Sequence, residues 1–184
     1  MRIIDLDAEN KETVRQTAAL LVAAFKEQGS FAWPHMKSAL KEVRESFNKD
    51  RISRIAIEED EVAGWIGGIR EYRGNTWELH PLAVRPDLQK KGIGRALVAD
   101  LEDRVRERGG VAITLGTDDV NNLTTVSGID LYPDVLDHLA KIKNLKDHPY
   151  QFYQKQGYTV TGIIPDANGF GKPDIIMSKR VREK

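Results

Sequence analysis

The residues with the clearest chemical potential form a short glycine loop, Gln89-Lys90-Lys91-Gly92-Ile93-Gly94-Arg95. An apolar run ending at Val84 precedes this loop, and an amphipathic helix follows it. A helix N-terminus presents unpaired backbone N–H groups and the positive end of its dipole, and glycine allows close approach of a ligand. The glutamine and the three cations of the loop add side-chain donors. The pattern predicts a pyrophosphate site, although an ordinary strand-to-helix turn can contain the same residues.

The loop excludes two common phosphate sites. It lacks the Gly-Lys-Ser/Thr of nucleoside triphosphate loops, and Leu97 stands where a dinucleotide loop has its third glycine. A phosphate-bearing cofactor of another kind is therefore expected.

The strand before the loop contains Pro81, which has no N–H for strand pairing. The strand is therefore expected to bulge or diverge there, which frees the backbone N–H groups of Leu82, Ala83 and Val84. An N–H group aimed at a developing oxyanion contributes roughly 3 kcal/mol to catalysis. The side chains of Leu82 and Val84 are expected in the core, which is compatible with a ligand-binding backbone.

Glu78 and His80 alternate along the same strand and are expected on one side of it. A carboxylate and an imidazole on one side of a strand can accept a proton from a bound ligand, directly or through water. Glu78 can equally anchor a cationic acceptor. His80 can equally be a structural histidine, hydrogen-bonded within the sheet.

Acidic and amide side chains follow a later buried strand, at Asp118, Asp119 and Asn121. With nearby aspartates they could form a local acidic surface for a polycation, or they could be solvated loop residues. The spacing of a calcium loop is missing, and no metal site is predicted.

Composition limits the possible functions. The 184 residues contain 28 Lys plus Arg and 28 Asp plus Glu, so no global basic field indicates nucleic acid. The absence of cysteine excludes disulfides, thiolate metal sites and a cysteine nucleophile. No signal peptide or membrane-spanning run is evident, so a cytoplasmic protein without membrane partners is expected.

Apolar periodicity predicts one mixed α/β domain over residues 1–184. Expected strands cover 3–6, 52–57, 62–72, 77–84, 111–115, 158–164 and 174–181. Expected helices cover 10–25, 36–47, 93–108, 132–144 and 149–156, the first of them capped by Asn10.

Trp77-Glu78-Leu79-His80-Pro81-Leu82, the glycine loop and Pro149-Tyr150-Gln151-Phe152-Tyr153 together resemble the GNAT superfamily of acyl-CoA-dependent N-acetyltransferases. Further segments look like its chromosomal aminoglycoside 6'-N-acetyltransferase branch: Leu115-Gly116-Thr117-Asp118-Asp119, Asn144-Leu145 with His148-Pro149-Tyr150, and Ala167-Asn168-Gly169. This resemblance runs from about Arg51 to the C-terminus and is poor over the first fifty residues.

The resemblance implies a GNAT-like α/β fold, with a central, mostly antiparallel sheet of splayed strands flanked by helices. It places acceptor-shaping helices in residues 1–50, an acetyl-CoA-binding core in 77–110, and a closing helix and strands in 145–184. It implies acetyl transfer from acetyl-CoA to a small cationic amine through a tetrahedral intermediate, with the 6'-amine of an aminoglycoside as the leading acceptor. It also implies a homodimer and antibiotic resistance.

The same resemblance assigns roles to residues. Tyr153 is the expected general acid for the leaving thiolate, although the residues alone suggest core packing for this aromatic helix. The expected acceptor contacts are Tyr72, Glu78, Asp118, Asp119 and Asn121. Tyr72, Phe31 and Trp33 could line the acceptor cleft, or they could belong to the aromatic core. One departure concerns Asn121-Asn122, where relatives often carry a further acid.

Two alternatives remain at this stage. The chain could acetylate another amine, such as a polyamine, a peptide or a protein N-terminus. It could also be a non-catalytic acyl-CoA-binding module, against which the presence of both Glu78 and Tyr153 argues.

Overall fold

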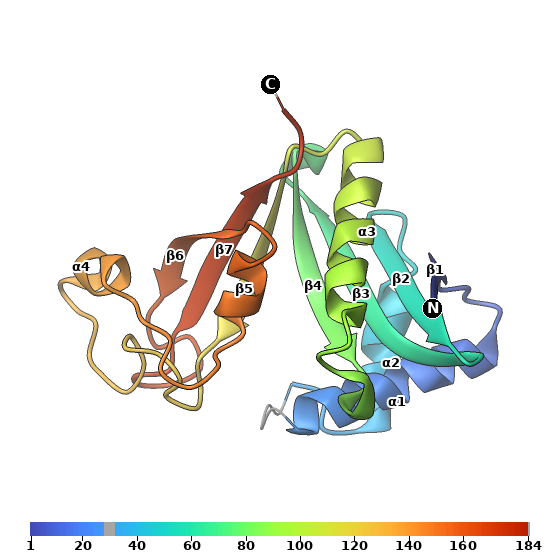
Figure 1. The fold of residues 1–184 in the computed structure, drawn as a ribbon, viewed down its shortest axis with the longest axis horizontal. Coiled ribbons are helices and arrows are strands. Elements are labelled where there is room, and N and C mark those ends of the chain that lie inside the picture. The colour runs from blue at the N-terminus through green and yellow to red at the C-terminus, as the bar shows by residue number, and fades with distance from the viewer. Residues whose placement is uncertain (28–31, 184) are drawn as a thin grey trace. The chain divides into compact units, whose positions relative to one another are not determined.

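The computed structural model describes residues 1–27 and 32–183. Contacts divide the chain into two compact units, one of Met1–Ile113 with the C-terminal segment from Val181, the other of Thr114–Arg180. We call them the N-terminal and the C-terminal unit (Figure 1). The single domain over 1–184 stays a prediction.

The N-terminal unit contains β1 (Arg2–Asp5), α1 (Lys11–Glu27), α2 (Met36–Glu45), β2 (Arg51–Glu58), β3 (Glu61–Glu71), the 3-10 turn η1 (Tyr72–Gly74), β4 (Thr76–Val84), the 3-10 turn η2 (Pro86–Leu88) and α3 (Ile93–Glu107). β5 (Ala112–Asp118) leads into the C-terminal unit, which contains α4 (Val135–Ala140), α5 (Tyr150–Gln154), β6 (Thr159–Ile164) and β7 (Asp174–Arg180).

Antiparallel pairing dominates both units. In the N-terminal unit the strand order is β1-β2-β3-β4, with each neighbouring pair antiparallel. In the C-terminal unit β7 lies between β5 and β6, and β6 pairs antiparallel with β7. The predicted α/β class with a mostly antiparallel sheet flanked by helices is confirmed, while splaying of strands stays a prediction.

Helices cover both faces of the N-terminal sheet (Figure 1). On one face, α1 and α2 pack on a core that includes Leu21, Trp65 and Ala83. Trp65 is fully buried, and its indole N–H donates to Ser53 Oγ at 3.0 Å. On the other face, α3 packs on β2, β3 and β4 through its buried apolar positions, Ile93, Leu97, Leu101 and Val105 among them. This packing fixes where α3, and therefore the loop before it, begins.

Arg54 joins three elements of the N-terminal unit. Its guanidinium donates to both carboxylate oxygens of Asp100 on α3, at 2.7 and 3.0 Å, and to Asp5 on β1 at 2.7 Å. The hydrogen bonds to Asp100 raise the pKa of Arg54, which stays charged although its residue is only 8% exposed. A paired, hydrogen-bonded charge is tolerable at such a depth.

Most expected elements are present, but the helix predicted over 132–144 is wrong in extent. α4 covers only Val135–Ala140. After it the chain turns and pairs with residues 123–125: Thr125 N–H donates to the Lys143 carbonyl, and Leu145 N–H donates to the Leu123 carbonyl. Backbone pairing outside the helix therefore overrides the apolar periodicity at Ile142.

The expected cap of α1 is confirmed, because Asn10 Oδ1 accepts the N–H of Thr13 at 3.1 Å. Within the described ranges, no helix has the length and apolar character needed to cross a membrane.

Candidate active site

The glycine loop has the geometry of an anion cradle. Gly92 occupies the N-cap of α3 with φ +91°, a left-handed conformation that favours glycine, and no described side chain caps the helix. A Cβ at Gly92 would meet no atom within 4 Å, so the space beside the loop is open. Lys90, Lys91 and Arg95 are exposed, whereas Ile93 is buried and contributes its backbone alone. The uncapped helix and the free cations fit the pyrophosphate of coenzyme A.

An ion-pair network supports the start of this loop. Arg85 forms two hydrogen bonds with Asp87, at 2.9 and 3.1 Å, and a third with Glu61 at 2.6 Å. The Arg85 guanidinium lowers the pKa of Asp87. Arg85 and Lys91 also line a hollow of about 330 Å³, together with Glu58, Glu59, Glu61 and Leu88. The network ties turn η2 to β3 directly before the loop.

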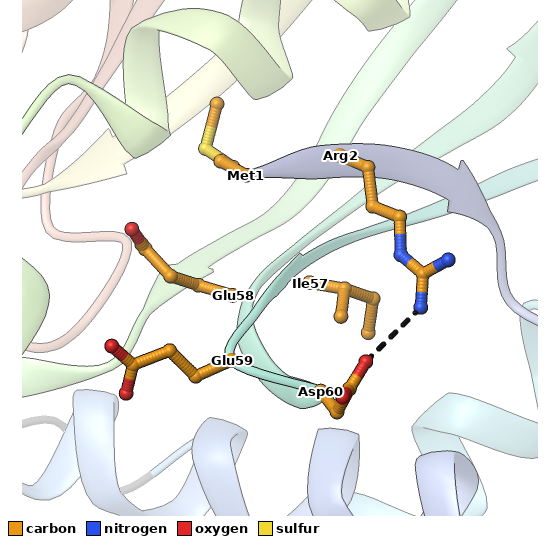
Figure 2. A pocket seen from close by; sticks show the side chains of 6 residues that line it. All are labelled: Met1, Arg2, Ile57, Glu58, Glu59 and Asp60. Carbon is orange, nitrogen blue, oxygen red and sulfur yellow. Dashed lines mark hydrogen bonds and ion pairs between the residues drawn. The ribbon is translucent and has the colours of Figure 1, made fainter.

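A second hollow of about 330 Å³ lies at the turn between β2 and β3, beside the N-terminal strand. Figure 2 shows its lining by Met1, Arg2, Ile57, Glu58, Glu59 and Asp60, with an ion pair between Arg2 and Asp60. Three of its six lining residues are acidic, so it repels a polyphosphate. The glycine loop, where Lys90, Lys91 and Arg95 are exposed, stays the predicted cofactor cradle.

A β-bulge shapes β4 where Pro81 predicted an interruption. Ile66 pairs with Leu82 and Gly68 pairs with Leu79, so His80 and Pro81 together oppose Gly67 alone. A Cβ on Gly67 would lie 2.2 Å from the His80 carbonyl oxygen, so only glycine fits opposite the bulge. Sequence reasoning missed Gly67, although glycine inside a strand signals a bulge or a close backbone approach.

The strand register decides which N–H groups of β4 are free of β3. Arg85 N–H donates to the Ala63 carbonyl at 2.9 Å. Because N–H groups alternate along a strand, those of Leu82 and Val84 point away from β3. The N–H of Ala83 points toward β3, where Ala83 is paired with Trp65. The geometry thus supports two of the three predicted backbone donors and leaves Ala83 without support.

Glu78 and His80 are half-buried on β4. The His80 ring lies 5.6 Å from that of Trp33, which is itself buried and packs edge-on against Phe25. Among the described residues, the Glu78 carboxylate has no hydrogen bond or ion pair. A half-buried carboxylate without a partner can accept a cationic amine or its proton.

The remaining predicted acceptor residues of this unit differ in position. Tyr72 is 75% exposed at turn η1, the end of the β3–β4 hairpin opposite the glycine loop. Trp33 lies beside His80, as described above. Phe31 lies outside the described residues.

Asp119 builds the loop that follows β5. It is fully buried, and its two carboxylate oxygens accept the N–H groups of Leu123 and Thr124, each at 2.8 Å. Its carbonyl accepts the hydroxyl of Ser127. We name residues 118–128 the Asp118 loop. Asp119 therefore holds the loop together. Its predicted contact with an acceptor stays a prediction, and the buried carboxylate gives it no support.

Asp118 and Asn121 are exposed in the same loop. Asp118 Oδ1 accepts the side-chain N–H of Asn168 at 2.6 Å. Asn122, in the Asn121-Asn122 pair where relatives often carry a further acid, has φ +54°, and its Oδ1 lies 3.0 Å from Ser127 Oγ. Asparagine tolerates this left-handed conformation.

His148, which sequence reasoning quoted without a role, is buried between the Asp118 loop and α5. Its Nδ1 accepts the N–H of Tyr150 at 3.2 Å, so Nε2 carries the proton and donates to the Asp118 carbonyl at 3.1 Å. Asn144 brackets its backbone, donating to the His148 carbonyl and accepting the His148 N–H, each at 2.9 Å. Burial lowers the pKa of His148 against the opposing effect of the nearby Asp118 and Asp119, which favours the neutral ring.

Tyr153 on α5 is only 9% exposed and packs edge-on against Phe152 and Tyr158. Burial raises the pKa of its hydroxyl, so the group keeps its proton at neutral pH. A proton donor needs that state, and core packing and catalysis are compatible for this side chain.

The structure brings the predicted residues together in two groups. The N-terminal unit aligns Glu78, His80 and Leu82 on β4, directly before the glycine loop. The C-terminal unit connects Asp118 with α5, which carries Tyr153, through His148.

Comparison with known proteins gives consistent matches. The model of the acetyltransferase (GNAT) family matches residues 18–127. A solved aminoglycoside 6'-N-acetyltransferase complexed with coenzyme A is 41% identical, and one from Enterococcus faecium is 42% identical. Both have a TM-score of 0.90, with 100% of this chain and 99% of the other covered. An aminoglycoside 6'-acetyltransferase type Ii is 37% identical, with a TM-score of 0.76 and the same coverage. No curated protein sequence matches significantly.

Substitution of Gly67 tests the bulge. Gly67→Ala should lower the free energy of unfolding by about 1–3 kcal/mol, because its Cβ overlaps the His80 carbonyl and the backbone of β4 must move. The amide NMR signal of Leu82 should shift with it. Gly68→Ala is the matched control, because its Cβ meets the flexible end of Leu101 at 2.9 Å. An unmoved Leu82 signal in Gly67→Ala would show that the bulge does not depend on this glycine.

The buried His148 predicts a stability change with pH. Its folded-state pKa is lowered, so below about pH 6.5 the unfolded chain takes up a proton that the folded chain resists. The contribution of His148 to stability is therefore full above pH 6.5 and decreases as pH falls. In denaturant unfolding, the free energy of unfolding of His148→Gln should be about 1–3 kcal/mol lower than that of the wild type at pH 8. The difference should be smaller at pH 5. A gap that is constant from pH 8 to pH 5 would contradict the assigned neutral ring.

Proposed function

Because the chain belongs to the GNAT acetyltransferase family, we propose that it transfers acetyl from acetyl-CoA to the 6'-amine of aminoglycosides. The choice of an aminoglycoside as acceptor is supported by similarity over the whole chain, at 41% and 42% identity, to enzymes of that activity. It includes the first fifty residues, where the motifs of the sequence were weakest. The unpartnered Glu78 and the exposed Asp118 provide negative charge for a polycationic acceptor.

Acetyl-CoA supplies a thioester whose carbonyl carbon the amine attacks, with loss of the thiolate. The N–H groups of the glycine loop and its cations bind the pyrophosphate. The Leu82 N–H donates to the carbonyl oxygen as negative charge develops there, and the Val84 N–H binds the pantetheine arm. Neither role needs a side chain.

The reaction moves two protons: a side chain accepts the one that the amine loses, and a side chain donates the one that the thiolate gains. Glu78, directly or through water and with His80 beside it, accepts the proton that the attacking nitrogen loses. The Tyr153 hydroxyl donates a proton to the leaving sulfur. Burial makes this phenol a weak acid, but the same low dielectric also raises the proton affinity of a thiolate.

The wider proposal places the enzyme in the cytoplasm, as a homodimer that confers antibiotic resistance. Largely exposed apolar side chains of the C-terminal unit, Tyr132, Leu136 and Phe170, support self-association.

A panel of amines tests the acceptor. Release of coenzyme A thiol should be fastest, by kcat/KM, with kanamycin- and tobramycin-like aminoglycosides that carry a free 6'-amine. Analogues with a 6'-hydroxyl are the matched control and should not react. Higher kcat/KM for a polyamine or a peptide would assign another acceptor, and coenzyme A binding without thiol release from any amine would indicate a non-catalytic module.

The role of Tyr153 is tested separately. Tyr153→Phe keeps the aromatic packing and should retain acetyl-CoA binding, while kcat falls by about 10- to 100-fold because the proton donor is lost. Tyr158→Phe, in the same aromatic cluster, is the control. Unchanged kcat in Tyr153→Phe, with pre-steady-state kinetics showing that chemistry limits the rate, would remove the acid role.

A further inference from the structure

We propose that His148 is a positioning residue that fixes the proton donor Tyr153 relative to the Asp118 loop, where the acceptor binds. The proposal rests on the proposed function. It concerns the C-terminal unit alone, in which both ends of the connection lie.

The strand side of this connection is a single hydrogen bond. His148 Nε2–H donates to the Asp118 carbonyl at 3.1 Å, where β5 ends and the Asp118 loop begins. The Asp118 carboxylate is held by Asn168 at 2.6 Å, and the loop beyond it by the buried Asp119. A shift of His148 therefore displaces the backbone that carries the exposed acid.

The helix side begins two residues later. His148 Nδ1 accepts the N–H of Tyr150, the first residue of α5. Pro149 follows His148 directly, and its carbonyl accepts the N–H groups of Phe152 and Tyr153. The start of α5, and so the position of the Tyr153 ring, is tied to the same imidazole.

Every polar atom of His148 is used. The residue is 1% exposed, its two ring nitrogens serve the strand and the helix, and Asn144 holds its N–H and carbonyl. A neutral imidazole has one donor and one acceptor on a rigid ring, so it can hold two backbone groups at a fixed separation. In a buried site, losing either bond leaves an unsatisfied group that the surrounding chain must move to satisfy.

Two substitutions separate the two bonds. In His148→Asn the amide oxygen can replace Nδ1 and keep the Tyr150 N–H, but no atom reaches the Asp118 carbonyl. In His148→Gln the amide nitrogen can replace Nε2 and keep the Asp118 carbonyl, but the Tyr150 N–H loses its acceptor. His138→Asn, on α4 of the same unit, is the matched control.

Kinetics measured at temperatures below the onset of unfolding distinguish a positioning role of His148 from a role in stability alone. We expect His148→Asn to raise the acceptor KM and His148→Gln to lower kcat, each by about tenfold, since misplacement by an ångström can cost up to about 100-fold. The KM for acetyl-CoA should stay within twofold, because its cradle belongs to the N-terminal unit. Both variants behaving like His138→Asn while fully folded would overturn the proposal.

Hydrogen exchange gives a readout that needs no activity. In His148→Gln, where the Tyr150 N–H loses its acceptor, exchange of the Phe152 and Tyr153 amides should accelerate although their own hydrogen bonds to Pro149 are unaltered, whereas β6 and β7 stay protected. A uniform acceleration over the whole unit, or none on α5, would overturn the connection. If the wild type acetylates no amine, the proposed function fails, and the exchange result alone decides whether His148 joins the two elements.

Discussion

The bulge in β4 is the constraint on which the candidate site depends. Two residues, His80 and Pro81, oppose Gly67, so the strand gains one residue relative to β3. The ring of His80 lies beside Trp33, and Ala83 belongs to the same core, although three positions separate them. Side chains three apart on a regular strand face opposite sides, and the extra residue restores them to one side. The shift leaves Glu78 and His80 on the face of the sheet that α1 and α2 cover, where Ala83 belongs to the core.

The two units use different physical means to hold their candidate site residues. The N-terminal unit offers backbone groups: the N–H groups of Leu82 and Val84, which point away from β3, and those of the uncapped first turn of α3. These donors need no side-chain reorganisation when charge develops. The C-terminal unit instead satisfies its buried polar groups completely around His148 and Asp119, which makes that region rigid. Such a network holds the loop that carries the exposed Asp118 and the helix that carries the buried Tyr153.

Local signals in the sequence predicted the parts that local chemistry decides. Asn10 caps α1, the glycine loop opens α3, and Pro81 marks the irregular point of β4. The signals failed where backbone groups found partners far along the chain. The helix expected through Asn144 ends at Ala140 because residues 143–145 pair with residues 123–125. Asp119 was expected in an acidic surface with other aspartates or as a solvated loop residue, yet both its carboxylate oxygens accept N–H groups of the loop that it organises.

The sequence by itself determined the donor side of this protein: an uncapped, glycine-led helix start with three cations, after a strand broken by proline. Glycine conformation and the missing N–H of proline are properties of single residues, so they hold wherever the chain folds. Only the tertiary structure decided which backbone N–H groups of β4 point away from β3, which aspartate is exposed, and what His148 connects. Those outcomes depend on strand register and on hydrogen bonds between residues 30 positions apart in the sequence, such as that from His148 to Asp118. No local pattern encodes them, because each partner is chosen by the packing that brings it near.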